Sequence, residues 1–177
     1  MHKLTIEEMH RLEPTEFRKA EKLPLVVILD NVRSLHNVGS TLRTSDAFRI
    51  HSVCLCGITG KPPSAEIHKT ALGAEDSVEW HYFPSAAIAI ASLRARGYSV
   101  WAVEQVSGSI PLQSFPFSRS KPIALVFGNE VHGVSQEALD ICDGAIEIPQ
   151  YGTKHSLNVS VTVGIVLWEA MKHMLSY

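Results

Sequence analysis

The amino-acid sequence predicts an α/β protein in which a parallel sheet is flanked by helices on both faces. Segments typical of strands alternate with segments typical of helices along most of the 177 residues, the pattern of parallel strands joined by crossover helices. The clearest strand, Leu23–Asp30, is short and apolar throughout, as expected of a strand buried on both faces. The clearest helix, 85–97, has Ser85 as its N-cap and Gly97 just past its end.

The other elements are predicted from the same local signals. In the polar stretch before the first strand, Thr5 and Glu8 form a capping-box pattern, and Pro14 is expected to end that helix. We expect a C-cap at Gly73 and a last helix from Ser156 to about Leu175. The remaining segments are expected as helices over 37–48, 64–73 and 135–142, strands over 51–58, 98–105, 121–130 and 144–149, and an alternating segment over 77–83. The chain would then comprise a short helical arm, 1–22, and one domain, 23–177.

The composition is that of a globular protein without an overall positive charge. Apolar residues make up 45% of the chain and charged residues 19%, and the formal net charge is −2. A nucleic-acid binder of this composition would need a local basic patch. No apolar stretch approaches the roughly 18 residues of a membrane span, so we expect a soluble, cytoplasmic protein. Cys54 and Cys56 share one face of a strand, which we interpret, with Cys142, as reduced core cysteines.

Three loops that follow strands carry polar residues with little use in packing. The first contains Asn37-x-Gly39-x-x-x-Arg43, the second reads "GNEVHG" after a strand ending near Phe127, and the third reads "PQYGTKHSLN" after Ile148. Ligands of parallel sheets bind at the carboxyl ends of the strands, where these loops should meet. The dinucleotide fingerprint GxGxxG and the P-loop are absent, which argues against a nicotinamide dehydrogenase or an NTPase.

Each of these residues also has an ordinary structural alternative. Asn37 could cap the helix that follows it, Arg43 could lie on the surface, and Glu130 could be solvated. Ser156 could be the N-cap of the last helix, whereas Asn158 would lie two residues inside that helix, where asparagine is a mediocre choice. Capping alone is a poor explanation for three such loops on one edge of a sheet.

The three loops resemble the signature motifs of the SpoU, or TrmH-like, branch of the SPOUT RNA methyltransferases. The first motif is matched by "NVGSTLRTSDAF", the second by "LVFGNEVHGVS" and the third by "IEIPQYGTKHSLNVSVTVGIVLWE". The resemblance implies a C-terminal deep trefoil knot in the α/β domain, although knots are otherwise almost absent from proteins. It also implies a homodimer with active sites near the subunit interface, an S-adenosylmethionine cofactor, and methyl transfer to a ribose 2′-oxygen of RNA.

The resemblance also assigns roles to individual residues. The residues that it places in catalysis are Arg43, Asn37, Glu130, Ser156 and Asn158. Those expected to bind the cofactor are Gln105, Gly128, Ile148, Gln150, Ser156 and Leu157, and no metal is implied. Because arginine stays protonated at ordinary pH, a cationic Arg43 could grip a neighbouring phosphate and stabilise the 2′-oxyanion. His36 and His155 lie beside the motifs and could act as bases, but a structural or solvent-exposed role is favoured for each.

The chain departs from the family at Arg49, which follows "AF" where the family usually has glycine. This departure should alter a turn and the RNA surface rather than the chemistry. Basic residues of the arm and first loop are interleaved with glutamates, so RNA contact and a solvated helix face are equal interpretations for them; they are Arg11, Arg18, Lys19, Lys22 and Arg33. Lys61 and Lys154 could add contacts from other loops, and single-stranded or looped RNA is the expected target.

The sequence leaves the RNA itself open. Transfer RNA is favoured over ribosomal RNA by the size of the chain and by the lack of a second domain in it. Two rivals remain: an RNA-binding protein of the same fold that is catalytically silent, and a methyltransferase that acts on a base. The intact motif residues argue against the first rival, and the first-motif arginine favours ribose over base.

Overall fold

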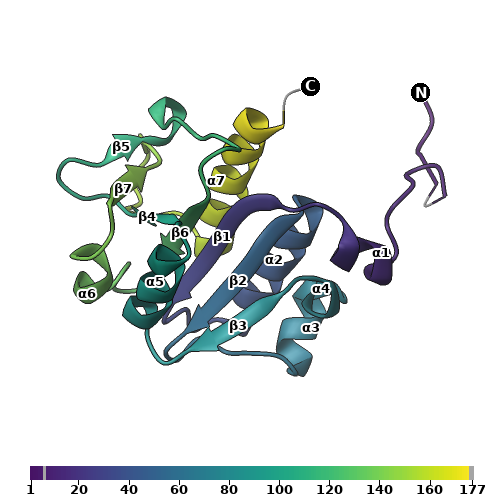
Figure 1. Cartoon of the computed structure of the whole chain (residues 1–177), viewed down its shortest axis with the longest axis horizontal. Coiled ribbons are helices and arrows are strands. Elements are labelled where there is room, and N and C mark those ends of the chain that lie inside the picture. The colour runs from purple at the N-terminus through teal and green to yellow at the C-terminus, as the bar shows by residue number, and fades with distance from the viewer. Residues whose placement is uncertain (6, 176–177) are drawn as a thin grey trace.

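The computed structural model describes residues 1–5 and 7–175, which form one seven-stranded sheet with helices on both faces (Figure 1). The strand order is β3-β2-β1-β6-β4-β7-β5, and every pair of neighbours is parallel. The strands are β1 (Leu23–Asp30), β2 (Ile50–Cys56), β3 (Trp80–Phe83), β4 (Ser99–Val103), β5 (Ile110–Pro111), β6 (Ile123–Phe127) and β7 (Gly144–Glu147). The predicted α/β class is confirmed.

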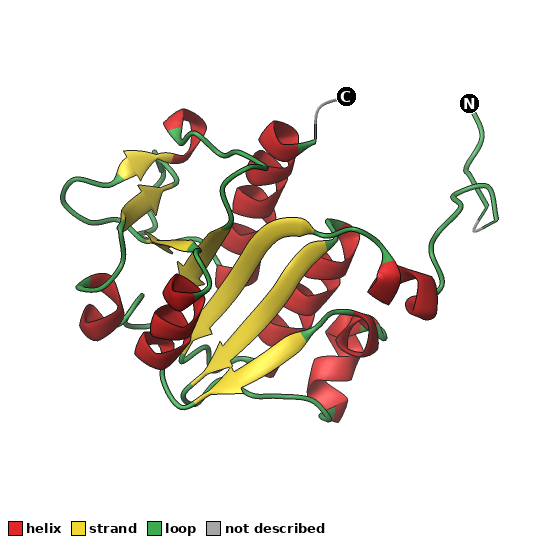
Figure 2. Ribbon diagram, viewed as in Figure 1, coloured by secondary structure: helices red, strands yellow, loops and turns green. Residues whose placement is uncertain are grey.

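Two hydrophobic clusters lie on opposite faces of this sheet, and different helices cover them (Figure 2). The larger cluster is covered by α1 (Pro14–Lys19), α2 (Leu35–Ala47), α3 (Ala65–Ala71), α4 (Ala74–Ser77), α7 (Val159–Met174) and the 3₁₀ turn η1 (Leu112–Ser114). The smaller is covered by α5 (Ala86–Ala95) and α6 (Gln136–Leu139). Strand β1 sends Val27 into the first cluster and Val26 into the second, which explains why its sequence is apolar throughout.

Several local predictions are confirmed. Strand β1 has the predicted bounds. The hydroxyl of Ser85 accepts from the backbone N–H of Ile88 as the N-cap of α5, and Gly97 follows in the left-handed conformation with φ +86°. Cys54 and Cys56 are buried in the same cluster, and all three cysteines are free thiols. Burial raises the pKa of the Cys54 thiol to about 12, so this thiol is un-ionised and inert at neutral pH.

Other local predictions are wrong, and each error has a local cause. Thr5 and Glu8 do exchange the two hydrogen bonds of a capping box, but around a turn. Pro14 begins helix α1 instead of ending one, because the missing N–H is not needed in the first turn of a helix. Leu72, not Gly73, is the C-cap of α3, and Gly73 instead precedes the additional short helix α4.

The last helix also starts later than predicted. Its first residue is Val159, so Ser156 belongs to the preceding loop. The helix packs on α2 through one face that includes Val163, Val166 and Ala170. Within the described residues, no helix combines the length and apolarity needed to cross a bilayer.

Candidate active site

A cavity of about 510 Å³ lies beyond the carboxyl ends of three strands in the middle of the sheet. Its lining comes from the loops that follow β4, β6 and β7 and from the start of α7. All six residues expected to bind the cofactor line it: Gln105, Gly128, Ile148, Gln150, Ser156 and Leu157. We refer to this space as the Gly128 cavity. Its position is the one at which ligands of open parallel sheets bind.

The loop after β6 forms a tight turn. Two positions in this turn, Gly128 and Gly133, require glycine. The backbone N–H groups of Asn129 and Gly133 each donate to the carbonyl oxygen of the other, at 2.9 Å in both cases. A side chain on Gly128 would overlap the backbone of Gly133 and Val134. Gly133 has φ +68°, and a side chain there would overlap Glu104. The glycines of the second motif therefore shape the wall of the cavity.

Glu130 is a structural anchor for the first motif. One carboxylate oxygen accepts from the Ser34 backbone N–H and from the Asn37 side-chain amide, and the other accepts from the Arg33 backbone N–H, each at 3.0 Å. Partial burial alone would raise the pKa of Glu130, but these hydrogen bonds outweigh it and hold the pKa below its ordinary value. The carboxylate stays charged and fixes the start of α2.

A chain of hydrogen bonds joins all three motifs. The Asn158 side-chain amide donates to the Asn37 side-chain oxygen at 3.1 Å, and Asn37 donates in turn to Glu130. The oxygen of the same Asn158 side chain accepts from the backbone N–H of Ser160 at 2.9 Å and of Val161 at 3.3 Å. Asn158, rather than Ser156, is thus the N-cap of α7, and its placement inside the helix was wrong. One amide both caps the helix and ties it to α2.

Arg43 lies apart from these residues. It is exposed and lines a second cavity, of about 840 Å³, together with Arg11 and Arg49. We refer to this second space as the Arg43 groove. Asn37 and Arg43 are six residues apart on α2, a rotation of roughly 240° at about 3.6 residues per turn, so their side chains leave the helix on different sides. Of the two histidines considered as bases, His155 lines the Gly128 cavity, whereas His36 pairs with Glu66 at 3.0 Å.

Sequence reasoning missed several residues that shape the Gly128 cavity. Glu104 and Glu147 line it near the ends of β4 and β7, and His132 lines it from the second loop. Asn129 holds that loop by accepting from the Val131 backbone N–H at 2.8 Å. The position of Glu104 and Glu147 at strand ends was the available signal. The described lining contains Glu104, Glu130 and Glu147 but neither lysine nor arginine, so the cavity favours a cationic ligand.

The chain belongs to the SpoU rRNA Methylase family, whose pattern matches residues 24–168. A protein of Thermus thermophilus named tRNA (guanosine(18)-2′-O)-methyltransferase is 34% identical over 168 residues, 95% of this chain and 84% of that protein. A 23S rRNA (guanosine-2′-O-)-methyltransferase of Nitrosomonas europaea is 34% identical over 84% of this chain and 56% of that protein. The family membership confirms the resemblance that the three motifs carry.

Solved structures agree with this assignment. The AdoMet-bound rRNA methyltransferase from Sinorhizobium meliloti superimposes with a TM-score of 0.80 at 31% identity, over 90% of this chain and 61% of that chain. The A. aeolicus TrmH/SpoU tRNA modifying enzyme superimposes with a TM-score of 0.79 at 30% identity, over 90% and 81%. This chain therefore spans most of the transfer-RNA relatives and a little over half of the ribosomal-RNA relatives.

Proposed function

We propose that this chain is an S-adenosylmethionine-dependent methyltransferase that modifies a ribose 2′-hydroxyl of RNA. The observation that carries the proposal is the hydrogen-bonded chain Asn158–Asn37–Glu130, which joins the three family motifs beside the Gly128 cavity. Relatives named as tRNA and 23S rRNA 2′-O-methyltransferases support the same reaction.

The Gly128 cavity fits the cofactor in size and in charge. A volume of about 510 Å³ lies within the range of roughly 300–1,000 Å³ that is usual for cofactor sites. S-adenosylmethionine, when bound, supplies a methyl group on a positively charged sulfur, and three glutamates line the cavity. We expect Gln105, Gly128, Ile148, Gln150, Ser156 and Leu157 to hold it.

The reaction asks the protein mainly for positioning and charge stabilisation. A ribose hydroxyl is a weak nucleophile, and in-line attack requires its oxygen to be held in line with the methyl group. A guanidinium group is a cation with a planar set of donors, so we assign Arg43 to grip a phosphate next to the target and to stabilise the developing 2′-oxyanion. Asn37, Glu130 and Asn158 hold the first and third motifs in register, and Ser156 faces the cavity from the loop before α7.

The position of Arg43 supports a homodimer. Arg43 does not line the Gly128 cavity of its own chain, so a second copy would complete the site by contributing its arginine. Helix α7 and the residues just before it expose an apolar stripe of Leu157, Val161, Ile165 and Trp168. Gly164 lies beside this stripe with open space where a side chain would be. A glycine inside a helix costs about 1 kcal/mol relative to alanine, which the close approach of a partner helix would explain.

The dimer is tested by replacing Gly164. Gly164→Leu should leave the folded chain intact, because nothing lies within 4 Å of a Cβ atom added at this position, but it should shift the sedimentation coefficient from dimer toward monomer. A His173→Leu control, at an exposed position of the same helix about 100° around its axis from the stripe, should remain dimeric. A wild-type chain that sediments as a monomer at micromolar concentration would exclude the homodimer.

The trefoil knot is a further part of the proposal. It is supported by a sheet order in which β7 lies between β4 and β5, while α7 returns to pack on α2. Joining the two termini and then unfolding the ring tests it, because a knotted ring stays more compact than an open ring of equal length. If the unfolded ring migrates in a gel as fast as an open ring of equal length does, the knot is contradicted.

We propose transfer RNA as the substrate, ribosomal RNA as the alternative, and the cytoplasm as the compartment. A transfer-RNA transcript and a 23S rRNA fragment, each incubated with the protein and S-adenosylmethionine, are compared by alkaline hydrolysis. Cleavage needs a free 2′-hydroxyl, so a methylated ribose leaves one gap in the ladder of the true substrate. Radiolabelled methyl in RNA with an unbroken ladder would mean a base acceptor. Cofactor binding without transfer to either RNA would favour a catalytically silent RNA-binding protein.

A further inference from the structure

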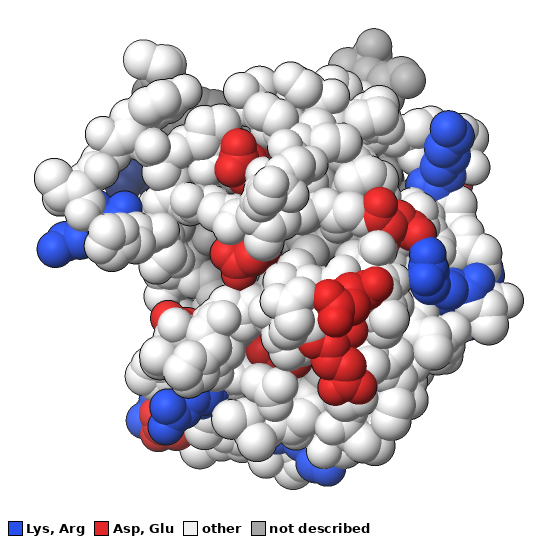
Figure 3. Space-filling view, turned by 90° about the vertical axis from the view of Figure 1, so that its left-hand side faces the viewer, with Lys and Arg blue, Asp and Glu red and all other residues white. Residues whose placement is uncertain are grey.

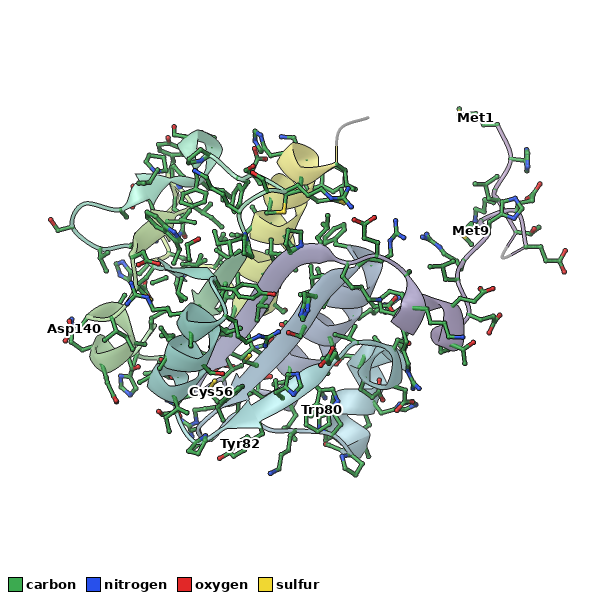
Figure 4. The ribbon with its side chains drawn as sticks, in the orientation of Figure 1. Met1, Met9, Cys56, Trp80, Tyr82 and Asp140 are labelled. Atoms are coloured by element: carbon green, nitrogen blue, oxygen red, sulfur yellow. The ribbon has the colours of Figure 1, made fainter. Side chains whose placement is uncertain are left out.

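We propose that the Arg43 groove binds the sugar-phosphate backbone of an RNA strand, with Arg49 and Arg11 as its phosphate-binding residues beside Arg43. The groove is bounded by the last turn of α2, by residues 71–74 between α3 and α4, and by the N-terminal arm from His10 to Phe17. Figure 4 shows Met9 on that arm, at the side of the molecule where α1 lies. This inference rests on the proposed RNA-modifying function, which already assigns Arg43 to a phosphate next to the target, and it adds Arg49 and Arg11 to that surface.

The charge of the groove is suited to a polyanion. Arg11, Arg43 and Arg49 line it, and Asp46 is the one carboxylate in its described lining. Two other arginines are engaged in ion pairs: Arg94 pairs with Asp143, and Arg119 pairs with Glu21. Within the described residues, neither Arg43 nor Arg49 takes part in such a pair. Free guanidinium groups in a groove can bind phosphates with two parallel hydrogen bonds each.

The backbone of the groove is strained, and the strain is concentrated there. Four non-glycine residues of the described chain have positive φ, and three of them line this groove: His10 at 47°, Arg49 at 47° and Leu72 at 53°. Residues other than glycine adopt this conformation only at a cost in conformational energy, because the Cβ atom comes too close to the following carbonyl oxygen. Strain of this kind persists mainly where a side chain is needed for function.

Arg49 and Leu72 show what those side chains could supply. Glycine at position 49 would fit this turn without strain. Because the chain has Arg49 there instead, a guanidinium group is present and the turn is less stable. Leu72 is 60% exposed at the end of α3, another position that glycine usually occupies. An arginine for phosphate and a leucine for the apolar face of a ribose or base form a composite surface for a looped or single strand.

Replacing each strained residue by glycine tests the proposal. The probe is an unmodified transfer-RNA transcript, whose binding is measured by filter retention at several salt concentrations. Arg49→Gly should weaken binding roughly tenfold at low salt and reduce the slope of log K against log salt by about one. Leu72→Gly should weaken binding roughly threefold without changing that slope, because it removes no charge. Both variants should melt higher than the wild type, by about 2–4 °C.

The control is Arg96→Gly, which removes the same charge at the end of α5, on the opposite face of the sheet. It should leave both RNA affinity and salt slope unchanged. The proposal is wrong if Arg96→Gly and Arg49→Gly lose RNA affinity equally, or if Arg49→Gly binds RNA as the wild type does. A parallel methylation assay of the wild type separates the two proposals. If the wild type methylates RNA but Arg49→Gly binds RNA with normal affinity, only the groove is rejected. If Arg49→Gly loses the salt-dependent RNA binding but the wild type does not methylate RNA, only the enzymatic function is rejected.

Discussion

The Gly128 cavity and the Arg43 groove are connected to opposite ends of the same helix, α2, and are built in opposite ways. The first turn of α2 is tied to Glu130 of the cavity, where polar side chains are paired and glycines shape the backbone. The last turn of α2 lines the groove, where Arg43 and Arg49 have no ion-pair partner among the described residues and non-glycine residues occupy strained conformations. The cavity is lined by glutamates and the groove by arginines.

The contrast indicates two ligands of opposite charge. A preorganised, acidic cavity suits a small cation that must be held in one orientation. Arginines left unpaired at the surface suit a long polyanion, whose phosphates supply the missing partners. Figure 3 shows acidic side chains near the middle of the face toward α6 and β7, with lysines and arginines nearer its margins. The small net charge of the chain is therefore the sum of separate acidic and basic regions.

The largest expected effect is a loss of cofactor binding that is confined to the Gly128 cavity. Gly128→Val should abolish binding of S-adenosylmethionine in calorimetry, because its side chain would push the backbone of Gly133 and Val134 into a new position. Gly152→Val is the matched control, since a side chain on Gly152 meets nothing within 4 Å. RNA affinity should survive in both variants, and normal cofactor affinity in a folded Gly128→Val protein would remove the site assignment.

The next effect concerns the residue that should link the two regions. Arg43→Ala should leave cofactor affinity nearly unchanged and cut single-turnover methylation roughly 100-fold or more, as loss of an oxyanion donor does. Arg43→Lys should rescue little of this rate, because lysine is a point charge and cannot make a bidentate contact. Rapid quenching with radiolabelled cofactor measures both rates. A lysine variant that regains most of the rate would show that charge alone suffices.

The same two regions show how far sequence reasoning reaches. The sheet, its helices and the gathering of the three loops at one edge could be predicted, because burial periodicity and strand-end loops are local properties. The cap of α7 could not be assigned, because Ser156 and Asn158 are both good caps and the choice depends on where Asn158 meets Asn37. The Arg43 groove could not be predicted, since it forms where the arm, α2 and the segment after α3 converge.

A smaller effect tests whether Glu130 acts as an anchor. Glu130→Gln should reduce the free energy of unfolding by roughly 1 kcal/mol in urea titrations, because an amide cannot accept the same set of charge-assisted hydrogen bonds. The pKa of Glu130 is lowered in the fold, so its stabilisation is present above the ordinary glutamate range and is lost as pH falls through the lowered value. The difference between wild type and variant should therefore shrink in acid. A difference that is constant from neutral to acidic pH would show that ionisation of Glu130 does not matter.

The smallest effect concerns Asp46, the one carboxylate in the described lining of the Arg43 groove. Burial raises the pKa of Asp46, against the opposing influence of Lys22 and Arg11, so the ionised form is disfavoured in the fold and stability is lost as pH rises through that pKa. Asp46→Asn should therefore stabilise the protein slightly at neutral pH and, by removing repulsion of phosphate, tighten transfer-RNA binding roughly twofold to fivefold at low salt. Asp140→Asn, at the end of α6 on the other face of the sheet, is the control and should bind as the wild type does. Because exposed charges are screened within about 10 Å at 0.1 M salt, the advantage of Asp46→Asn should disappear as salt is raised. Weaker RNA binding by Asp46→Asn would mean that the aspartate positions the arginines, and the groove would then resemble the Gly128 cavity in being held by paired charges.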